Sequence, residues 1–265
     1  MTTCHAAFLK LGRVEPMKNI IKLPKKADPN IKQVFDEFLA DQRTRLKPGT
    51  AKGYEDVIRL LTDYINSYAH ESLSKTESAF FDKYFNAQGK EHREYCDLFG
   101  PGKIIGELGM FLGYFITRKV MAGADFKRLA GTVTKKLSKW LHEKKYITEE
   151  EAKHGAEEGA DAAKSLPKAE KAAQMLYNAA EALDIDPNEL SDDDYYDFDH
   201  YTIEKMEPGK LWLKVYDEKC KKMIGPIAVP RKATELLSEG WDISCALGRK
   251  RGKWMIIEMA NVYPN

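Results

Sequence analysis

The stretch DFKRLAGTVTKKLSKWLHEKKYI, residues 125–147, decides the fold of the first half of the chain. Its apolar residues recur every three or four positions, which predicts one amphipathic helix with a buried stripe: Phe126, Leu129, Val133, Leu137, Trp140 and Leu141. Most of its cations lie off that stripe. We therefore expect an exposed basic side formed by Lys127, Arg128, Lys135, Lys136 and Lys139.

The residues before this stretch predict further helices. Apolar side chains keep the same spacing in residues 34–39 and again in residues 54–68, and Thr50 is the expected N-cap of the second run. Residues 104–120 are apolar on more than one side, so we expect this helix at the centre of a bundle. Together these helices predict an all-α domain over residues 29–147.

The formal net charge of +1 hides three segments of different charge. Residues 1–147 carry 26 Lys and Arg against 17 Asp and Glu, residues 148–200 carry 4 against 16, and residues 201–265 carry 12 against 8. Such asymmetry indicates a charged partner for the basic parts. The alternative is that each charge merely keeps its segment solvated.

The acidic middle predicts two helices. A capping box at Thr148–Glu151 starts the first, and an Ala/Leu stripe follows from Leu166 to Leu183 in the second, which we expect to begin near Pro167. We interpret residues 148–197 as an acidic helical linker or a coiled-coil-like arm.

The last part of the chain has a different pattern of apolar residues. Short apolar runs at 211–216, 223–229, 241–247 and 254–259 alternate with Gly- and Pro-containing turns, which is typical of β-strands. Residues 198–265 therefore predict a small β-barrel of the SH3-like or OB-like type. The expected fold class is α+β multidomain, with a SAM-like helical bundle first and the small barrel last.

Composition supports a packed chain outside the membrane. Apolar residues make up 43% and charged residues 31% of 265, and no apolar run approaches the roughly 18 residues that a membrane span needs. The N-terminus has no secretory signal pattern, so we expect residues 1–28 to be a flexible segment, with Met17 as a second possible start after an extension of residues 1–16. Four widely spaced cysteines predict reduced thiols and a cytoplasmic protein.

Motifs of catalysis and metal binding are missing from the sequence. The six histidines form no H-x-x-x-H pair, no G-x-S-x-G elbow occurs, and Gly100–Lys103 lacks the spacing of a phosphate-binding loop. We expect no enzyme activity, no cofactor and no metal, and we read His200 among aspartates as part of a solvated loop. Should an unrecognised activity exist, Lys103 and Glu107 are the residues to test first.

The basic clusters are the better functional candidates, because a protein that neutralises phosphates releases condensed counterions. One cluster surrounds a helix junction, a second follows the helices of residues 104–145, and a third lies between two expected strands beside Trp254. The expected nucleic-acid-binding residues are Arg43, Arg45, Lys47, Thr50, Lys52, Arg118, Lys119, Lys127, Arg128, Lys135, Lys136, Arg249, Lys250, Arg251 and Lys253. Trp212, Trp241 and Trp254 are expected in the core, with base stacking as the alternative.

The span 34–147 resembles the SAM-like core-binding domain of tyrosine recombinases, the phage integrase family. The matching phrases are Phe35-Asp-Glu-Phe38-Leu39, Lys47-Pro48-Gly49-Thr50 followed by Tyr54, Leu60-Leu61, Tyr64-Ile65, and Leu137 to Ile147 with Trp140 and Tyr146. The resemblance implies a helical bundle that clamps DNA through its backbone. It implies this role for Arg45, Lys47, Thr50, Lys52, Lys135 and Lys136.

The chain departs from that family in its catalytic part. No histidine is followed by arginine three residues later, and the β-rich end is too short for the catalytic domain. We therefore expect a non-catalytic DNA-binding or recombination-accessory protein that grips double-stranded DNA. The alternative is a protein–protein scaffold that uses residues 166–183 or the C-terminal barrel.

Overall fold

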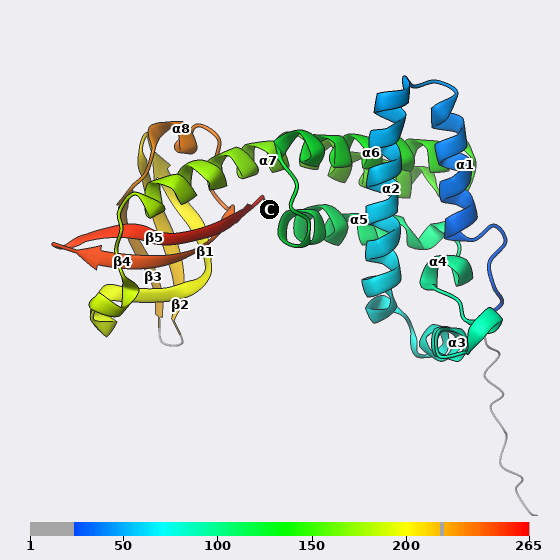
Figure 1. Cartoon of the computed structure of the whole chain (residues 1–265), viewed down its shortest axis with the longest axis horizontal. Helices are drawn as coiled ribbons and strands as arrows, with labels where there is room; N and C mark the ends of the chain where they lie inside the picture. The colour runs from blue at the N-terminus through cyan, green and yellow to red at the C-terminus, as the bar shows by residue number, and fades with distance from the viewer. Residues whose placement is uncertain (1–23, 218–219, 265) are drawn as a thin grey trace, which may run out of the picture.

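The computed structural model describes residues 24–217 and 220–264 and shows a mixed α+β protein (Figure 1). Helices come first along the chain, and a five-stranded antiparallel sheet follows. Each part has its own buried core, and the long helix α7 contributes side chains to both. The expected α+β class is thus confirmed. Within the described residues, no helix has the length and apolarity needed to cross a membrane. Residues 1–23 lie outside the described part.

The helical part is built on α1 (Ile31–Arg43) and α2 (Pro48–Tyr68), which stand side by side and are crossed by α6 (Ala124–Glu143) (Figure 1). Trp140 of α6 joins them, because its ring packs edge-on against Phe38 and its Nε1 donates to Asp41 at 2.9 Å. The N-cap of α2 is Lys47 with Pro48 at the first helical position, so the expectation of Thr50 as N-cap was wrong. Proline is suited to that position because its missing N–H has no partner there.

The remaining helices of this part are short or irregular. They are α3 (Lys75–Phe85), α4 (Tyr95–Leu98) and α5 (Leu108–Met110). Where one central helix was expected over 104–120, the structure has 3₁₀ turns, the single turn α5 and a π-helix over Phe111–Lys119. The segment is central as expected, since Ile104, Leu108, Phe111 and Ile116 are fully buried. Glycine at 106, 109 and 113 lowers the helix propensity of this segment.

Helix α7 (Glu149–Glu181) runs without a break through Pro167, so the expectation of two helices was wrong. A proline inside a helix costs about 3 kcal/mol. Here burial offsets it, because Leu166 belongs to the helical core while Leu176 belongs to the core under the sheet. Residues 148–197, expected as an acidic linker, therefore form a helix that both cores use and then enter the sheet.

The strands are β1 (Tyr195–Glu207), β2 (Lys210–Asp217), β3 (Cys220–Ala228), β4 (Asp242–Lys250) and β5 (Lys253–Tyr263), with the short α8 (Arg231–Thr234) after β3. Their order is β3-β2-β1-β4-β5, and each neighbouring pair is antiparallel. In the residues that the structure describes this sheet is open, with β3 and β5 at its edges, where a closed barrel was expected. The C-terminal half of α7 packs against it through Ala172 and Leu176.

Strand β1 is the element that the sequence did not predict. Its first half is acidic and exposed, and only from Tyr201 does burial alternate, with Tyr201 and Ile203 in the core. A register shift between Tyr196 and Asp199 interrupts its pairing with β4. The acidic residues and this irregularity together hide the period of two by which strands are recognised.

Candidate nucleic-acid interface

The exposed side of α6 carries the best-formed group of cations in the helical part. Lys135, Lys136 and Lys139 are exposed, and within the described residues none of them forms an ion pair. Arg128 lies on the same side but pairs with Asp125 at 2.9 Å. The spacing of Arg128, Lys135 and Lys139 by seven and four residues places them on one helix face, with Lys136 beside them. The exposed basic side expected for α6 is therefore confirmed for these four of its five residues.

The helix is held in this orientation from two sides. Its apolar stripe is fully buried at Val133, Leu137 and Leu141. Its side toward α7 meets that helix backbone to backbone, where Gly131 faces Gly159 and Ala163. The exposed face therefore belongs to a rigid support.

The junction between α1 and α2 adds two more free cations. Arg45 and Lys47 are exposed and form no ion pair within the described residues. Two of their neighbours are engaged, because Arg43 pairs with Glu55 at 2.9 Å and Lys52 with Asp56 at 3.3 Å. Thr50 is exposed in the first turn of α2, and its side chain makes no hydrogen bond to any residue in the described part of the chain.

These two groups are neighbours in space. An ideal Cβ on Gly53 of α2 would lie 2.6 Å from Leu129 of α6, and Trp140 of α6 hydrogen-bonds Asp41 of α1. Helix α6 thus lies against both helices beside their junction. We call Arg45, Lys47, Lys135, Lys136 and Lys139 together the basic face.

One edge of the basic face is mixed in charge. A groove of about 520 Å³ runs between α6 and α7, and Lys135 and Lys139 line it together with Glu143, Glu149 and Glu157. These carboxylates lower the positive potential on the α7 side. The edge near Lys136 and the α1–α2 junction is the more cationic one.

Lys127 does not belong to the exposed side, so this expectation was wrong. Its side chain is 4% exposed and its ammonium pairs with Glu170 of α7. The position lies on the face of α6 that packs against α7, where a charge is buried only with a partner. Arg118 and Lys119 are exposed beside it, and the Arg118 guanidinium lies 5.6 Å from the ring centre of Tyr114.

The hairpin between β4 and β5 presents the third expected cluster. Lys250, Arg251 and Lys253 are exposed at its tip, where Arg251 and Gly252 adopt positive φ angles of 52° and 75°. Arg249 differs, because its guanidinium donates to Asp194 and lies 5.2 Å from the ring centre of Trp254. Three of the four cations at the tip thus form no ion pair with the residues that the structure describes.

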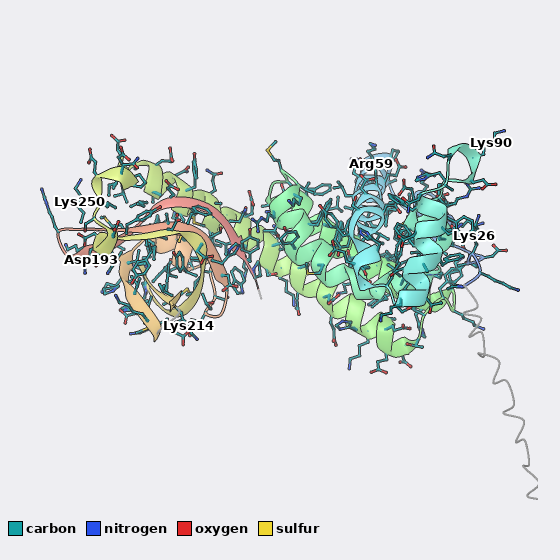
Figure 2. The ribbon with its side chains drawn as sticks, turned by 90° about the horizontal axis from the view of Figure 1, so that it is seen from below. Lys26, Arg59, Lys90, Asp193, Lys214 and Lys250 are labelled. Carbon is teal, nitrogen blue, oxygen red and sulfur yellow. The ribbon has the colours of Figure 1, made fainter. Side chains whose placement is uncertain are left out.

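The hairpin tip and the basic face do not form one site. Figures 1 and 2 both place the free end of the β4–β5 hairpin, marked by Lys250, at the end of the molecule away from α1, α2 and α3. Of the three tryptophans expected in the core, with base stacking as the alternative, Trp241 is buried at 8% exposure, while Trp212 and Trp254 are half-buried beneath Lys205 and Arg249.

Glu107 and Lys103, the two residues to test first for catalysis, lie in different surroundings and do not contact each other's partners. The Glu107 carboxylate accepts hydrogen bonds from the Tyr64 hydroxyl and from Ser72 Oγ, each at 3.1 Å, beside a cavity of about 440 Å³. Burial, followed by the charge of Glu107, raises the pKa of the Tyr64 hydroxyl. Lys103 does not line that cavity and pairs with Glu77 at 2.7 Å, which lowers the pKa of Glu77 to about 2.

The expected docking helix of the scaffold alternative is occupied by the chain itself. Leu166, Ala169, Ala173, Leu176 and Ala180 are all buried in the two cores. At the end of this stripe Leu183 is 41% exposed.

His200 lies in β1 and is exposed. Among the described residues, no three His, Cys, Asp or Glu side chains gather as metal ligands do.

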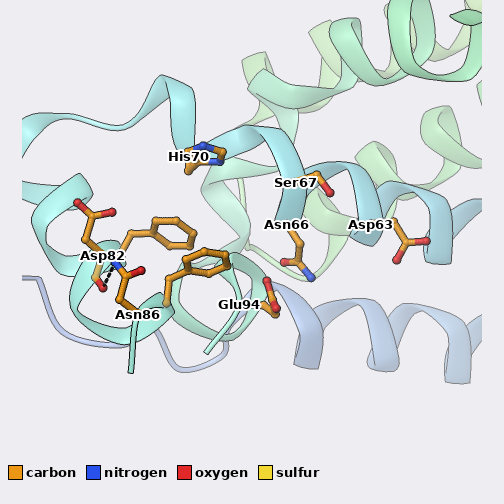
Figure 3. A pocket seen from close by; sticks show the side chains of 9 residues that line it. Asp63, Asn66, Ser67, His70, Asp82, Asn86 and Glu94 are labelled. Atoms are coloured by element: carbon orange, nitrogen blue, oxygen red, sulfur yellow. Dashed lines mark hydrogen bonds between the residues drawn. The ribbon is translucent and has the colours of Figure 1, made fainter. Parts of the chain in front are cut away.

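The sequence did not reveal a cavity of about 850 Å³ between α2 and α3 (Figure 3). Its polar lining includes Asp63, Asn66, Asp82 and Glu94, which come from three separate segments. The signal that could have pointed to it is Phe85, which continues the apolar stripe of α3 past its buried part and is 41% exposed.

Comparison of this chain with protein-family models, with curated proteins and with solved structures found no match. Its function is therefore inferred from the geometry of its own residues.

Proposed function

We propose that this protein binds double-stranded DNA through the basic face and acts without cleaving it. The observation that carries this proposal is the group of three unpaired lysines on the outer side of α6, with Arg45 and Lys47 beside it. Cations that form no ion pair within the described residues gain the most when they replace the counterions of a polyanion.

The dimensions of the face suit a duplex backbone. Four residues separate Lys135 from Lys139 on the basic face, which corresponds to about 6 Å along a helix. Over that length of axis a duplex carries roughly three to four phosphates on its two strands. The cations of the basic face match several of them without reading a base, which fits an accessory role more than a sequence-specific one.

The expected SAM-like bundle and the expected SH3-like or OB-like module would both suit this function. The resemblance of residues 34–147 to the core-binding domain of tyrosine recombinases would make the helical part a backbone clamp in which Arg45, Lys47, Lys135 and Lys136 contact phosphates. The sheet would then act like a small SH3-like or OB-like module, whose hairpin tip with Lys250, Arg251 and Lys253 gives a second backbone contact. We propose a cytoplasmic protein of this kind.

The test is fluorescence anisotropy with a mixed-sequence 30-base-pair duplex and the full chain at several salt concentrations. The variant replaces Lys135, Lys136 and Lys139 by Gln. A matched control replaces Lys75, Lys83 and Lys90, three exposed lysines around α3, by Gln. The control tests whether the position of the charge matters or only its sum.

We expect the α6 variant to reduce the slope of log affinity against log salt by about 2–3, since each lost phosphate contact contributes about 0.9. The control should keep the slope of the wild type. Absence of binding by the wild-type chain at 50 mM salt, or equal losses in the two variants, would refute the proposal.

A further inference from the structure

The hairpin that joins β4 and β5 ends in a two-residue turn. Lys250 and Lys253 are its last paired residues, so Arg251 and Gly252 form the turn. Both have positive φ angles, 52° and 75°, as a type I′ turn requires. Asparagine, aspartate and glycine are favoured at the first of these positions, because other side chains are strained there. Such strain is concentrated at sites that bind ligands, so the arginine at the turn calls for a functional explanation.

The side chains of the tip are free to meet a ligand. Arg251 is exposed and forms no hydrogen bond, ion pair or ring contact with the described residues, and the same holds for Lys250 and Lys253. Gly252 has no side chain, and nothing lies within 4 Å of an ideal Cβ built on it. The turn thus presents a single side chain, the guanidinium of Arg251, with one lysine behind it on each strand.

The root of the hairpin is fixed by Arg249. Its guanidinium donates to the Asp194 carboxylate and to the Asp193 carbonyl oxygen, and it lies over the ring of Trp254. An acidic turn therefore lies against the hairpin at this point, and Figure 2 shows Asp193 and the tip at the same end of the molecule. In the register of β4 and β5, only residues 250–253 extend beyond the contact.

This contact limits how deeply the hairpin can enter a duplex. A two-stranded ribbon fits the major groove, which is about 12 Å wide, but it must insert a length of both strands. Here the acidic turn at Asp193 and Asp194 would meet the phosphates if the ribbon entered past Arg249. A single arginine side chain needs no such depth and fits the minor groove, which is about 6 Å wide. Lys250 and Lys253 then face the phosphates on the two sides of that groove.

We propose that Arg251 enters the minor groove of the duplex, an inference that rests on the DNA binding proposed above. Runs of A·T pairs narrow this groove and strengthen its negative potential, which attracts arginine. A guanidinium is also less strongly hydrated than an ammonium group, so arginine suits the narrow groove better than lysine. The hairpin therefore reads the shape of the groove, and the protein prefers duplexes with A·T runs. The basic face contacts phosphates and adds equally to the affinity for any sequence.

The test compares binding of the full chain to two duplexes of equal length by fluorescence anisotropy at one salt concentration. One duplex contains runs of A·T pairs, and the other contains G·C pairs alone. Arg251→Asn removes the guanidinium and places Asn before Gly252, which is a favoured pair in a type I′ turn, so the hairpin should keep its shape. Thermal unfolding checks that it does. The control, Lys232→Gln, removes an exposed cation from α8 in the same part of the chain.

We expect the wild type to bind the A·T duplex at least about 5-fold more tightly than the G·C duplex, which is the low end of the cost of one unfavourable base pair. Arg251→Asn should lose most of this preference, and the Lys232→Gln control should keep it. Netropsin, which fills the minor groove of A·T runs, should lower the affinity of the wild type for the A·T duplex to that for the G·C duplex.

The outcomes separate this inference from the proposed function. Equal binding of the two duplexes by the wild type, a preference that survives in Arg251→Asn, or a preference that netropsin leaves unchanged would overturn the role of Arg251 and leave the proposed DNA binding standing. Binding of neither duplex at low salt would overturn the proposed function and this inference with it.

Discussion

The crossing of α6 and α7 depends on glycine, and Gly131→Ala should disrupt it. An ideal Cβ on Gly131 would lie 2.4 Å from the backbone nitrogen of Ala163 and 2.6 Å from the carbonyl oxygen of Gly159. Both atoms belong to the backbone, so no change of rotamer relieves the contact. The two helices must move apart by roughly 1 Å to restore ordinary packing distances.

Two opposing effects set the size of the change. Alanine gains about 1 kcal/mol of helix propensity over glycine in a helix interior. Overpacking and the loosened contacts between α6 and α7 lower the stability by more than this gain. Large losses of this kind are typical where the core cannot rearrange around the new side chain. We expect a net loss of about 2–4 kcal/mol in the free energy of unfolding, close to the upper range of single substitutions.

The assay is urea unfolding of the full chain followed by far-ultraviolet circular dichroism. Gly49→Ala in the first turn of α2 is the control, since nothing lies within 4 Å of an ideal Cβ there. The control should change stability by no more than about 0.5 kcal/mol. If Gly131→Ala were as stable as the wild type, α6 and α7 would not be in backbone contact at this position, and α7 would not hold the basic face in place.

Two further predictions concern charged groups. Ion pairing and capping lower the pKa of Glu77 to about 2, so the stability that its charge supplies is complete above its ordinary value of 4.5 and is lost as pH falls from 4.5 towards 2. Glu77→Gln should therefore unfold at a lower urea midpoint than the wild type at pH 7. At pH 2 the two midpoints should nearly coincide, and a difference between them that does not change with pH would contradict this. Glu170→Ala should cost about 2–3 kcal/mol because it leaves the buried Lys127 ammonium without a partner, and the further change Lys127→Met should restore most of the loss, as urea unfolding of both variants would show.

Helical periodicity was sufficient to place the main helices of the first part. The stripe in residues 125–147 predicted the buried face of α6, and Val133, Leu137 and Trp140 are buried as expected. The break expected at Pro167 failed for a tertiary reason. A proline tends to end a helix by local geometry, but α7 gains burial in two cores on either side of it, and sequence periodicity does not measure that gain.

The lysines of α6 show the same limit of prediction from sequence periodicity. Lys127 and Lys135 both lie off the apolar stripe of α6, so periodicity predicted the same exposed position for both. The structure separates them, because the Lys127 side chain is buried against Glu170 of α7, whereas the Lys135 side chain is exposed beside the groove between α6 and α7. Only the position of a second helix, 43 residues away along the chain at Glu170, makes this distinction.

The cavity of Figure 3 could not be predicted for a related reason. It is assembled from the end of α2, from α3 and from the residue before α4, and each of these segments alone has an unremarkable charge. Its carboxylates Asp63 and Asp82 come together only because α3 folds back beside α2. Sequence patterns report the spacing within one element and not the distance between elements.

The two ends of α2 carry opposite charges. In the proposed function the basic face would attract a duplex to the start of the helix, and the carboxylates Asp63, Asp82 and Glu94 would repel it from the other end. At physiological salt such fields fade over about 8 Å, which is much less than the roughly 30 Å between the ends. The affinity of the basic face for DNA should therefore depend little on these carboxylates.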